Sequence, residues 1–263
     1  MKRLTYILLL IGFTLFSVSY QNHNDASTPT YDSFKKGEFL KWRIHYGLIN
    51  AGYATLEMDE SHKNGQTLYH AKGKGWTVGA ARWFAKIDDI YESHFTKSDL
   101  KPVFFKRRVN EDGFRISRDL HFDHNAETVT INDLEKETKQ EKEIGNVQDM
   151  VSAFYFLREI DLSNIKEGDE KHVDLFFDGE TVPFKLKFIR RETIKTSLGK
   201  FKTWKMKPMV QKGRIFEGQD SVTLWISDDA NKVPIRIQAK LVVGSIKVDL
   251  DDYSGLVTEL KVE

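Results

Sequence analysis

The chain has 263 residues, carries 40 Lys and Arg against 39 Asp and Glu, and contains no cysteine. Because this balance gives no global positive field, we expect no nucleic-acid partner. The missing cysteine excludes disulfides, thiol catalysis, zinc–thiolate sites and the lipid attachment of a lipoprotein. The length is sufficient to bury a core that holds the fold without disulfides.

The first 19 residues have the pattern of a secretory signal peptide. A short basic start precedes an apolar run from Leu4 to Phe16, with small residues at Ser17 and Ser19. The run is shorter than the ~20 apolar residues of a spanning helix, so cleavage after Ser19 is favoured over an uncleaved anchor. We therefore expect a periplasmic protein that is not an integral membrane protein once processed.

Residues 20–37 carry few apolar groups and are typical of a flexible leader. From residue 38 onward no linker-like composition interrupts the sequence, which predicts one domain over 38–263. Apolar and polar residues alternate there, as in half-buried antiparallel strands. The first such run places Leu40, Trp42 and Ile44 on one face. About a dozen runs of this kind follow, separated by Asn-Gly and Asp-Gly turn signals.

One helix is predicted over residues 147–160, with Asn146 as a suitable N-cap. A weaker helical stretch covers residues 77–85. Residues 132–143 are charged and lack an apolar face, so we expect a solvated loop there. Together these elements predict a mainly β protein, a curled antiparallel sheet or open half-barrel with one α-helix packed on its concave side. The apolar residues at helical spacing are Val147, Met150, Val151, Phe154 and Leu157.

The chain contains two similar hairpins, at residues 43–60 and 236–252, whose bends carry apolar residues instead of polar ones. Apolar bend residues are usually buried, so we expect both bends to pack into the core. The alternative is an exposed apolar edge that contacts a ligand or partner, the C-terminal bend being the favoured one. The bend residues are Leu48 and Ile49 in the first hairpin and Leu241, Val242 and Val243 in the second.

The order of these features resembles a bacterial exported family known as domain of unknown function 3108. The resemblance runs from residue 34 to residue 256 through the stretches GEFLKWRIHYGLINAGYATLEM, IDDIYESHFTKSDLKPVFF, DMVSAFYFLREIDL, SLGKFKTWKMKP and LWISDDANKVPIRIQAKLVVGSIKVDL. It implies the fold and export, since the family has no assigned activity. By looser analogy the architecture is similar to the helix-plugged half-barrels of bacterial lipoprotein carriers, which does not establish function.

Catalytic signatures are absent from the sequence, including Gly-x-Ser-x-Gly, His-Glu-x-x-His and phosphate-binding loops. Asp119, His121 and Asp123 share one strand face, but about 7 Å between alternate side chains is too far for one ion. Alternation also places Asp88 away from Asp89, so no paired-carboxylate site is indicated. We therefore expect no metal, no cofactor and no catalysis.

Two features favour binding over chemistry, namely a high aromatic content and a basic stretch over residues 185–207. Lysines often only guard sheet edges, which is the alternative for the basic stretch. The predicted function is a non-catalytic cell-envelope protein that binds a lipid-like or glycan ligand or a partner protein. The alternatives are an enzyme acting on envelope glycan or lipid, and an interaction subunit of an outer-membrane assembly complex. The candidate binding residues are Trp76, Trp83, Tyr155, Trp204, Lys205, Lys207, Leu241, Val242 and Val243.

Overall fold

The computed structural model describes residues 31–63, 65–209, 222–241 and 244–263. The expected signal peptide and most of the expected leader lie outside these residues, as do Val242 and Val243. The first eight strands are β1 (Phe39–Tyr46), β2 (Ile49–Lys63), β3 (Gln66–Thr77), β4 (Asp88–Thr96), β5 (Pro102–Glu111), β6 (Phe114–Asp123), β7 (Thr128–Asp133) and β8 (Thr138–Glu143). The remaining strands are β9 (Val147–Gln148), β10 (Glu170–Phe177), β11 (Glu180–Thr196), β12 (Gly199–Met209), β13 (Val222–Ser227), β14 (Pro234–Lys240) and β15 (Ser245–Ser254).

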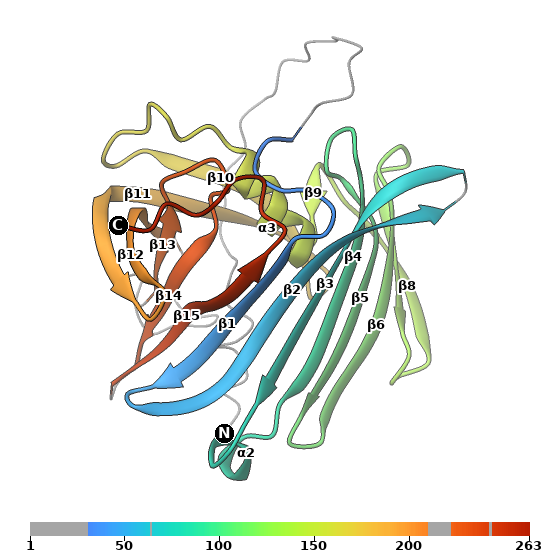
Figure 1. The fold of residues 1–263 in the computed structure, drawn as a ribbon. Helices are drawn as coiled ribbons and strands as arrows, with labels where there is room; N and C mark the ends of the chain where they lie inside the picture. The colour runs from blue at the N-terminus through green and yellow to red at the C-terminus, as the bar shows by residue number, and fades with distance from the viewer. Residues whose placement is uncertain (1–30, 64, 210–221, 242–243) are drawn as a thin grey trace.

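All fifteen strands belong to one sheet that curls without closing (Figure 1). Strand β1 lies in the middle and pairs antiparallel with both β2 and β15. On one side of β1 the strands follow in chain order from β2 to β8 at the edge. On the other side they follow in reverse order from β15 to β9 at the opposite edge. Within the described part of the chain, β9 and β10 form the one parallel pair. The prediction of a mainly β, open half-barrel is confirmed.

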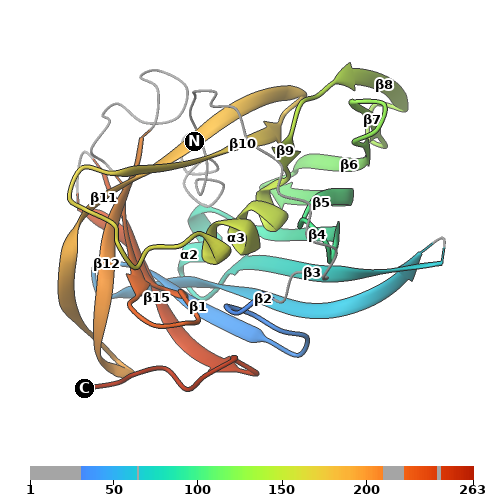
Figure 2. The same ribbon diagram turned by 90° about the horizontal axis from the view of Figure 1, so that it is seen from above.

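The helix α3 (Met150–Glu159) lies inside the curl, with β10–β15 on one side and β2–β6 on the other (Figure 2). It begins three residues later than predicted because residues 147 and 148 pair with β10 instead. Its N-cap is Asp149 rather than Asn146. The Asp149 carboxylate accepts hydrogen bonds from the Val151 and Ser152 backbone N–H groups at 2.7 and 2.8 Å. Ser152 Oγ accepts one in return from the Asp149 N–H, which completes a capping box.

Two other local predictions need correction. The helical stretch expected over 77–85 is a single turn, α2 (Ala81–Phe84). The charged segment expected to be a loop ends in strand β8, all of whose side chains are exposed. A strand at the open edge of a sheet needs no apolar face, because its backbone pairs with β7 on one side only. Its charged side chains also discourage pairing with another chain at this edge.

The core surrounds α3 on the concave face of the sheet. Tyr155 is fully buried, with its ring centroid 4.7 Å from that of Phe34 and 5.7 Å from that of Phe95. Phe34 comes from the last part of the expected leader, so residues 31–37 pack with the domain. A second apolar cluster lies between α3 and strands β10–β14 and includes Phe184 and Met206.

Candidate functional site

An apolar hollow lies between α3 and the inner face of strands β10–β14. Its cavity volume is about 40 Å³, and the surrounding space free of protein atoms, which includes open solvent, is about 590 Å³. The apolar lining residues are Phe154, Leu157, Ile160, Leu162, Phe184, Leu186, Met206, Leu224, Ile226 and Pro234.

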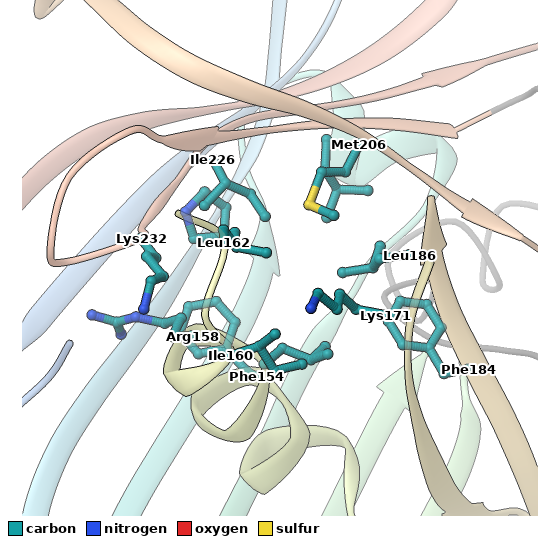
Figure 3. A pocket seen from close by; sticks show the side chains of 13 residues that line it. Phe154, Arg158, Ile160, Leu162, Lys171, Phe184, Leu186, Met206, Ile226 and Lys232 are labelled. Carbon is teal, nitrogen blue, oxygen red and sulfur yellow. The ribbon is translucent and has the colours of Figure 1, made fainter. Parts of the chain in front are cut away.

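Helical spacing explains why α3 contributes one wall of the apolar hollow. Residues one turn apart on a helix share a face, so Leu157 and Ile160 both point toward the second apolar cluster. Val151 and Tyr155, on the opposite face, pack into the core beside β3 and β4. On the sheet side, alternation turns every second residue of β11–β13 inward. Figure 3 shows Leu186 and Met206 turned toward this space from their strands.

Three cationic side chains line the apolar hollow: Arg158, Lys171 and Lys232. The Arg158 guanidinium is buried and makes two hydrogen bonds to the Glu38 carboxylate, at 2.6 and 2.7 Å. Its charge is therefore already neutralised. In the part of the chain that the structure describes, neither lysine has a carboxylate within 4 Å. Burial lowers the pKa of Lys232, an effect that the nearby carboxylates of Glu159 and Asp161 oppose.

The arrangement suits an amphipathic anion. An alkyl chain would bury its surface against the apolar wall, and a carboxylate or phosphate would meet an ammonium group at its border. A charge-assisted hydrogen bond is roughly twice as strong as one between neutral groups. The wall offers few hydrogen-bonding groups to a sugar.

A buried polar cluster lies elsewhere on the concave face, at β4 and β5. Asp89, Arg107 and Glu111 are 5%, 4% and 5% exposed. The Asp89 carboxylate accepts a hydrogen bond from the Asn110 backbone N–H at 3.0 Å, and burial raises the pKa of Asp89. Alternation does separate Asp88 from Asp89, as expected, but Asp89 meets a carboxyl group from the next strand. None of these side chains lines the apolar hollow.

The aromatic candidates from the sequence are dispersed. Tyr155 is core, and Trp204 is 5% exposed within the second apolar cluster, outside the lining of the hollow. Trp76 packs beside Tyr53, with ring centroids 5.9 Å apart. Trp83 is 86% exposed on α2. The structure therefore does not bring these four rings together.

The basic candidates lie on the outer face of the sheet. Alternation along β12 places Lys205 and Lys207 opposite to Met206, which points inward. Lys205 Nζ lies 3.1 Å from a Glu192 carboxylate oxygen and 5.1 Å from the centroid of the Trp225 ring. Sequence reasoning chose the lysines of β12 and missed Lys171 and Lys232, because only the curl of the sheet shows which cations face the helix.

The two hairpin bends lie at the same end of the sheet, because β1 pairs with both β2 and β15. The prediction that the first bend is core is wrong, since Leu48 is 106% exposed and Ile49 is 56% exposed. The described residues therefore leave this bend largely uncovered. Leu241 is half-buried, and the other two residues of the second bend lie outside the described residues.

Further exposed rings accompany this bend. The backbone N–H of Val78 donates to the Ala51 carbonyl at 3.0 Å, which holds the segment leading to α2 beside the start of β2. The turn α2, whose Trp83 and Phe84 are exposed, therefore lies at the same end of the sheet (Figure 1). We call the exposed residues at this end the apolar rim: Tyr46, Leu48, Ile49, Trp83 and Phe84.

The outer face of β3 and β4 carries a group that the sequence analysis did not assemble. His70 lies directly opposite His94, with Glu92 two residues away on the same strand face. Burial, with the neighbouring His70, lowers the pKa of His94 to about 4. By contrast, Asp119 is used in an ion pair with Arg108 at 2.6 Å, and the three residues of its strand form no metal-type cluster among the described side chains.

Comparison with known proteins agrees with this architecture. A model of a protein family of unknown function, DUF3108, matches residues 41–251. The chain belongs to the DUF3108 family. The sequence resemblance is thereby confirmed. None of the curated proteins matches this DUF3108 protein.

Two solved structures are similar to this DUF3108 protein at 10% sequence identity. A β-barrel-like DUF1849 protein from Brucella abortus aligns over 85% of this chain and 99% of its own, with a TM-score of 0.57. A Bacteroides fragilis protein described as exported, with a YmcC-like fold, covers 85% and 98%, with a TM-score of 0.36. The first of these supports the β-barrel-like fold and no function. Among the described helices, none is both long enough and apolar enough to cross a membrane.

Proposed function

We propose that this DUF3108 protein is an exported, non-catalytic binding protein that holds the alkyl chain of an anionic lipid-like molecule in the apolar hollow. The observation that carries the proposal is an apolar wall bordered by two lysines without a carboxylate within 4 Å in the described chain. The periplasmic location belongs to the proposal and rests on the signal-type sequence of residues 1–19.

The binding test uses a fluorescent fatty acid and the alcohol with the same chain. We expect saturable binding of the acid by the wild-type protein. Ile226→Trp, which places a bulky ring in the half-buried lining of the apolar hollow, should abolish it. Ile116→Trp is the matched control, because Ile116 is half-buried on β6, away from the hollow. Equal binding by both variants would place the ligand elsewhere.

The charge test removes the two ammonium groups together. Lys171→Ala with Lys232→Ala should weaken binding of the acid by about tenfold or more, the scale of a hydrogen bond to a charged group. Binding of the alcohol should change little. Lys205→Ala on the outer face is the control and should leave both unchanged. An equal loss for acid and alcohol would contradict the assigned role of the lysines.

A second candidate function rests on the apolar rim, and it is contact with a lipid surface. Leu, Trp and Phe at exposed tips are the residue types that enter the interfacial region of a bilayer. The rim projects from the end of the sheet instead of lining a groove, which favours a membrane over a peptide. Flotation with phospholipid vesicles should recover the wild-type protein, and Leu48→Ser with Trp83→Ser should reduce recovery. Unchanged recovery would reject this candidate.

A further inference from the structure

Two histidines and a glutamate meet on the outer face of the sheet, remote from the apolar hollow. One ligand-type atom from each of His70, Glu92 and His94 lies within 4.8 Å of the others. In the described residues no other group of three His, Asp or Glu side chains meets this condition. The histidines are direct cross-strand neighbours on β3 and β4, a pairing that brings Cβ atoms within about 5.5 Å.

The two imidazole rings are already nearly parallel. Their centroids are 4.2 Å apart and their planes differ by 6°. Glu92 Oε2 lies 3.4 Å from His70 Nε2. Around a tetrahedral ion with bonds of about 2.0–2.2 Å, ligand atoms are about 3.4 Å apart. Because the lone pair of each ring nitrogen lies in the ring plane, the two stacked rings must tilt out of their parallel arrangement to share one ion, and rotation about the side-chain bonds can supply this tilt.

The hydrogen bonds around the group leave one suitable atom free on each ligand. Ser61 Oγ lies 2.8 Å from His94 Nδ1, which fixes the ring and leaves Nε2 for an ion. Lys72 and Lys106 both approach Oε1 of Glu92, at 3.4 Å each, so Oε2 is left to face His70.

The remaining atom is His70 Nε2. It is buried, and its contact with Glu92 Oε2 at 3.4 Å lacks the geometry of a hydrogen bond, so no hydrogen bond to it forms among the described residues. A buried polar atom without a hydrogen bond is uncommon and calls for an explanation, such as an ion. This observation is independent of the spacing of the three residues.

We propose that His70, Glu92 and His94 bind one divalent cation of the zinc type, with water in the remaining coordination positions. Two imidazoles and a carboxylate suit zinc, whereas magnesium and calcium prefer oxygen ligands alone. Lys72 and Lys106 compete for the same carboxylate, so we expect micromolar affinity, weaker than that of a structural zinc site. The proposal is independent of the lipid-binding function.

The test is calorimetric titration of the full, untagged and chelator-treated protein with zinc chloride. We expect one equivalent to bind. His70→Gln and His94→Gln should each weaken binding by at least tenfold, and Ser61→Ala, which removes the hydrogen bond to His94, by about tenfold. His121→Gln is the matched control. His121 lies on the outer face of β6, outside the proposed site, so this variant should bind zinc as the wild type does.

A spectroscopic readout separates this site from incidental binding. Cobalt(II) in place of zinc should give visible absorption bands of tetrahedral intensity, which disappear in both histidine variants. Melting temperatures without metal show whether these variants remain folded. Wild-type protein that binds no zinc, or binding that survives in His70→Gln and His94→Gln, would overturn the proposal. Equal affinity for magnesium would also overturn it.

Discussion

The two sides of α3 differ in how completely they are filled. Toward β3 and β4, Tyr155 is fully buried between the rings of Phe34 and Phe95. Toward β10–β14, Leu157 is half-buried and borders the apolar hollow. The same helix is therefore a core element in one direction and a wall of a candidate site in the other.

The source of this difference is the segment that precedes β1. Residues 31–37 cross the concave face and insert Phe34, which is 1% exposed, against the first side of the helix. On the second side the loop after α3 inserts Leu162 and Ile165, 4% and 8% exposed, but aliphatic side chains and two lysines still border the apolar hollow. Space is thus left in a fold whose other half is tightly packed.

The buried ion pair that anchors the filled side gives the largest expected effect. Glu38→Ala leaves the Arg158 guanidinium, 3% exposed, without its carboxylate. Removing one partner of a buried pair typically costs about 3–5 kcal/mol of the free energy of unfolding. Urea denaturation measures it. The double variant Glu38→Leu with Arg158→Met should lose less free energy of unfolding than Glu38→Ala, because it leaves no unpaired buried charge. Equal losses would mean that packing, not the unpaired charge, causes the effect.

Neighbouring aromatic residues of α3 test the two sides directly. Tyr155→Ala should cost about 3–5 kcal/mol, as expected for a fully buried ring. Phe154 is half-buried, with one side near the Trp42 ring (centroids 6.1 Å apart) and the other bordering the apolar hollow, so Phe154→Ala should cost only about 1–2 kcal/mol. The helical spacing alone suggested the reverse, with Phe154 as the core residue. Equal losses in thermal unfolding would contradict the division between a filled and an open side.

The N-cap of α3 gives a pH-dependent effect on the filled side. Burial raises the pKa of Asp149 to about 6, above about 3.9 in the unfolded chain. Between these values the folded protein holds a proton that the unfolded chain releases, so stability falls as the pH rises from about 4 through 6. A shift of about two units corresponds to about 3 kcal/mol.

Asp149→Asn should remove this fall. The amide oxygen can still accept from the Val151 and Ser152 N–H groups, and its nitrogen can donate to Ser93 Oγ. Urea midpoints at pH 4, 6 and 8 measure the difference between the two proteins. We expect the stability of the variant to increase relative to that of the wild type as the pH rises from 4 to 8. Parallel profiles would contradict the raised pKa.

Local patterns predicted the strands and the helix because burial alternates along each element, as in β1, where Leu40, Trp42 and Ile44 are buried. They failed where neighbours in space decide the outcome. Strand β8 has no apolar pattern, since an edge strand is held by backbone pairing. Lys171 and Lys232 are 61 residues apart along the chain, and only the curl brings both to the apolar hollow.

The first bend gives the smallest expected effect and completes the comparison of filled and open regions. Ile49→Asn in a core bend would bury an unsatisfied amide, which costs about 1–3 kcal/mol or more. Ile49 is 56% exposed, so its polar replacement keeps its hydrogen bonds to water and should change stability by no more than about 0.5 kcal/mol. Ile44→Asn is the matched control, because Ile44 is 5% exposed on the adjoining strand and should be strongly destabilised. Denaturation midpoints of the two variants beside the wild type decide the matter. A large loss for Ile49→Asn would mean that this bend is covered in solution, and the apolar rim would then begin at α2.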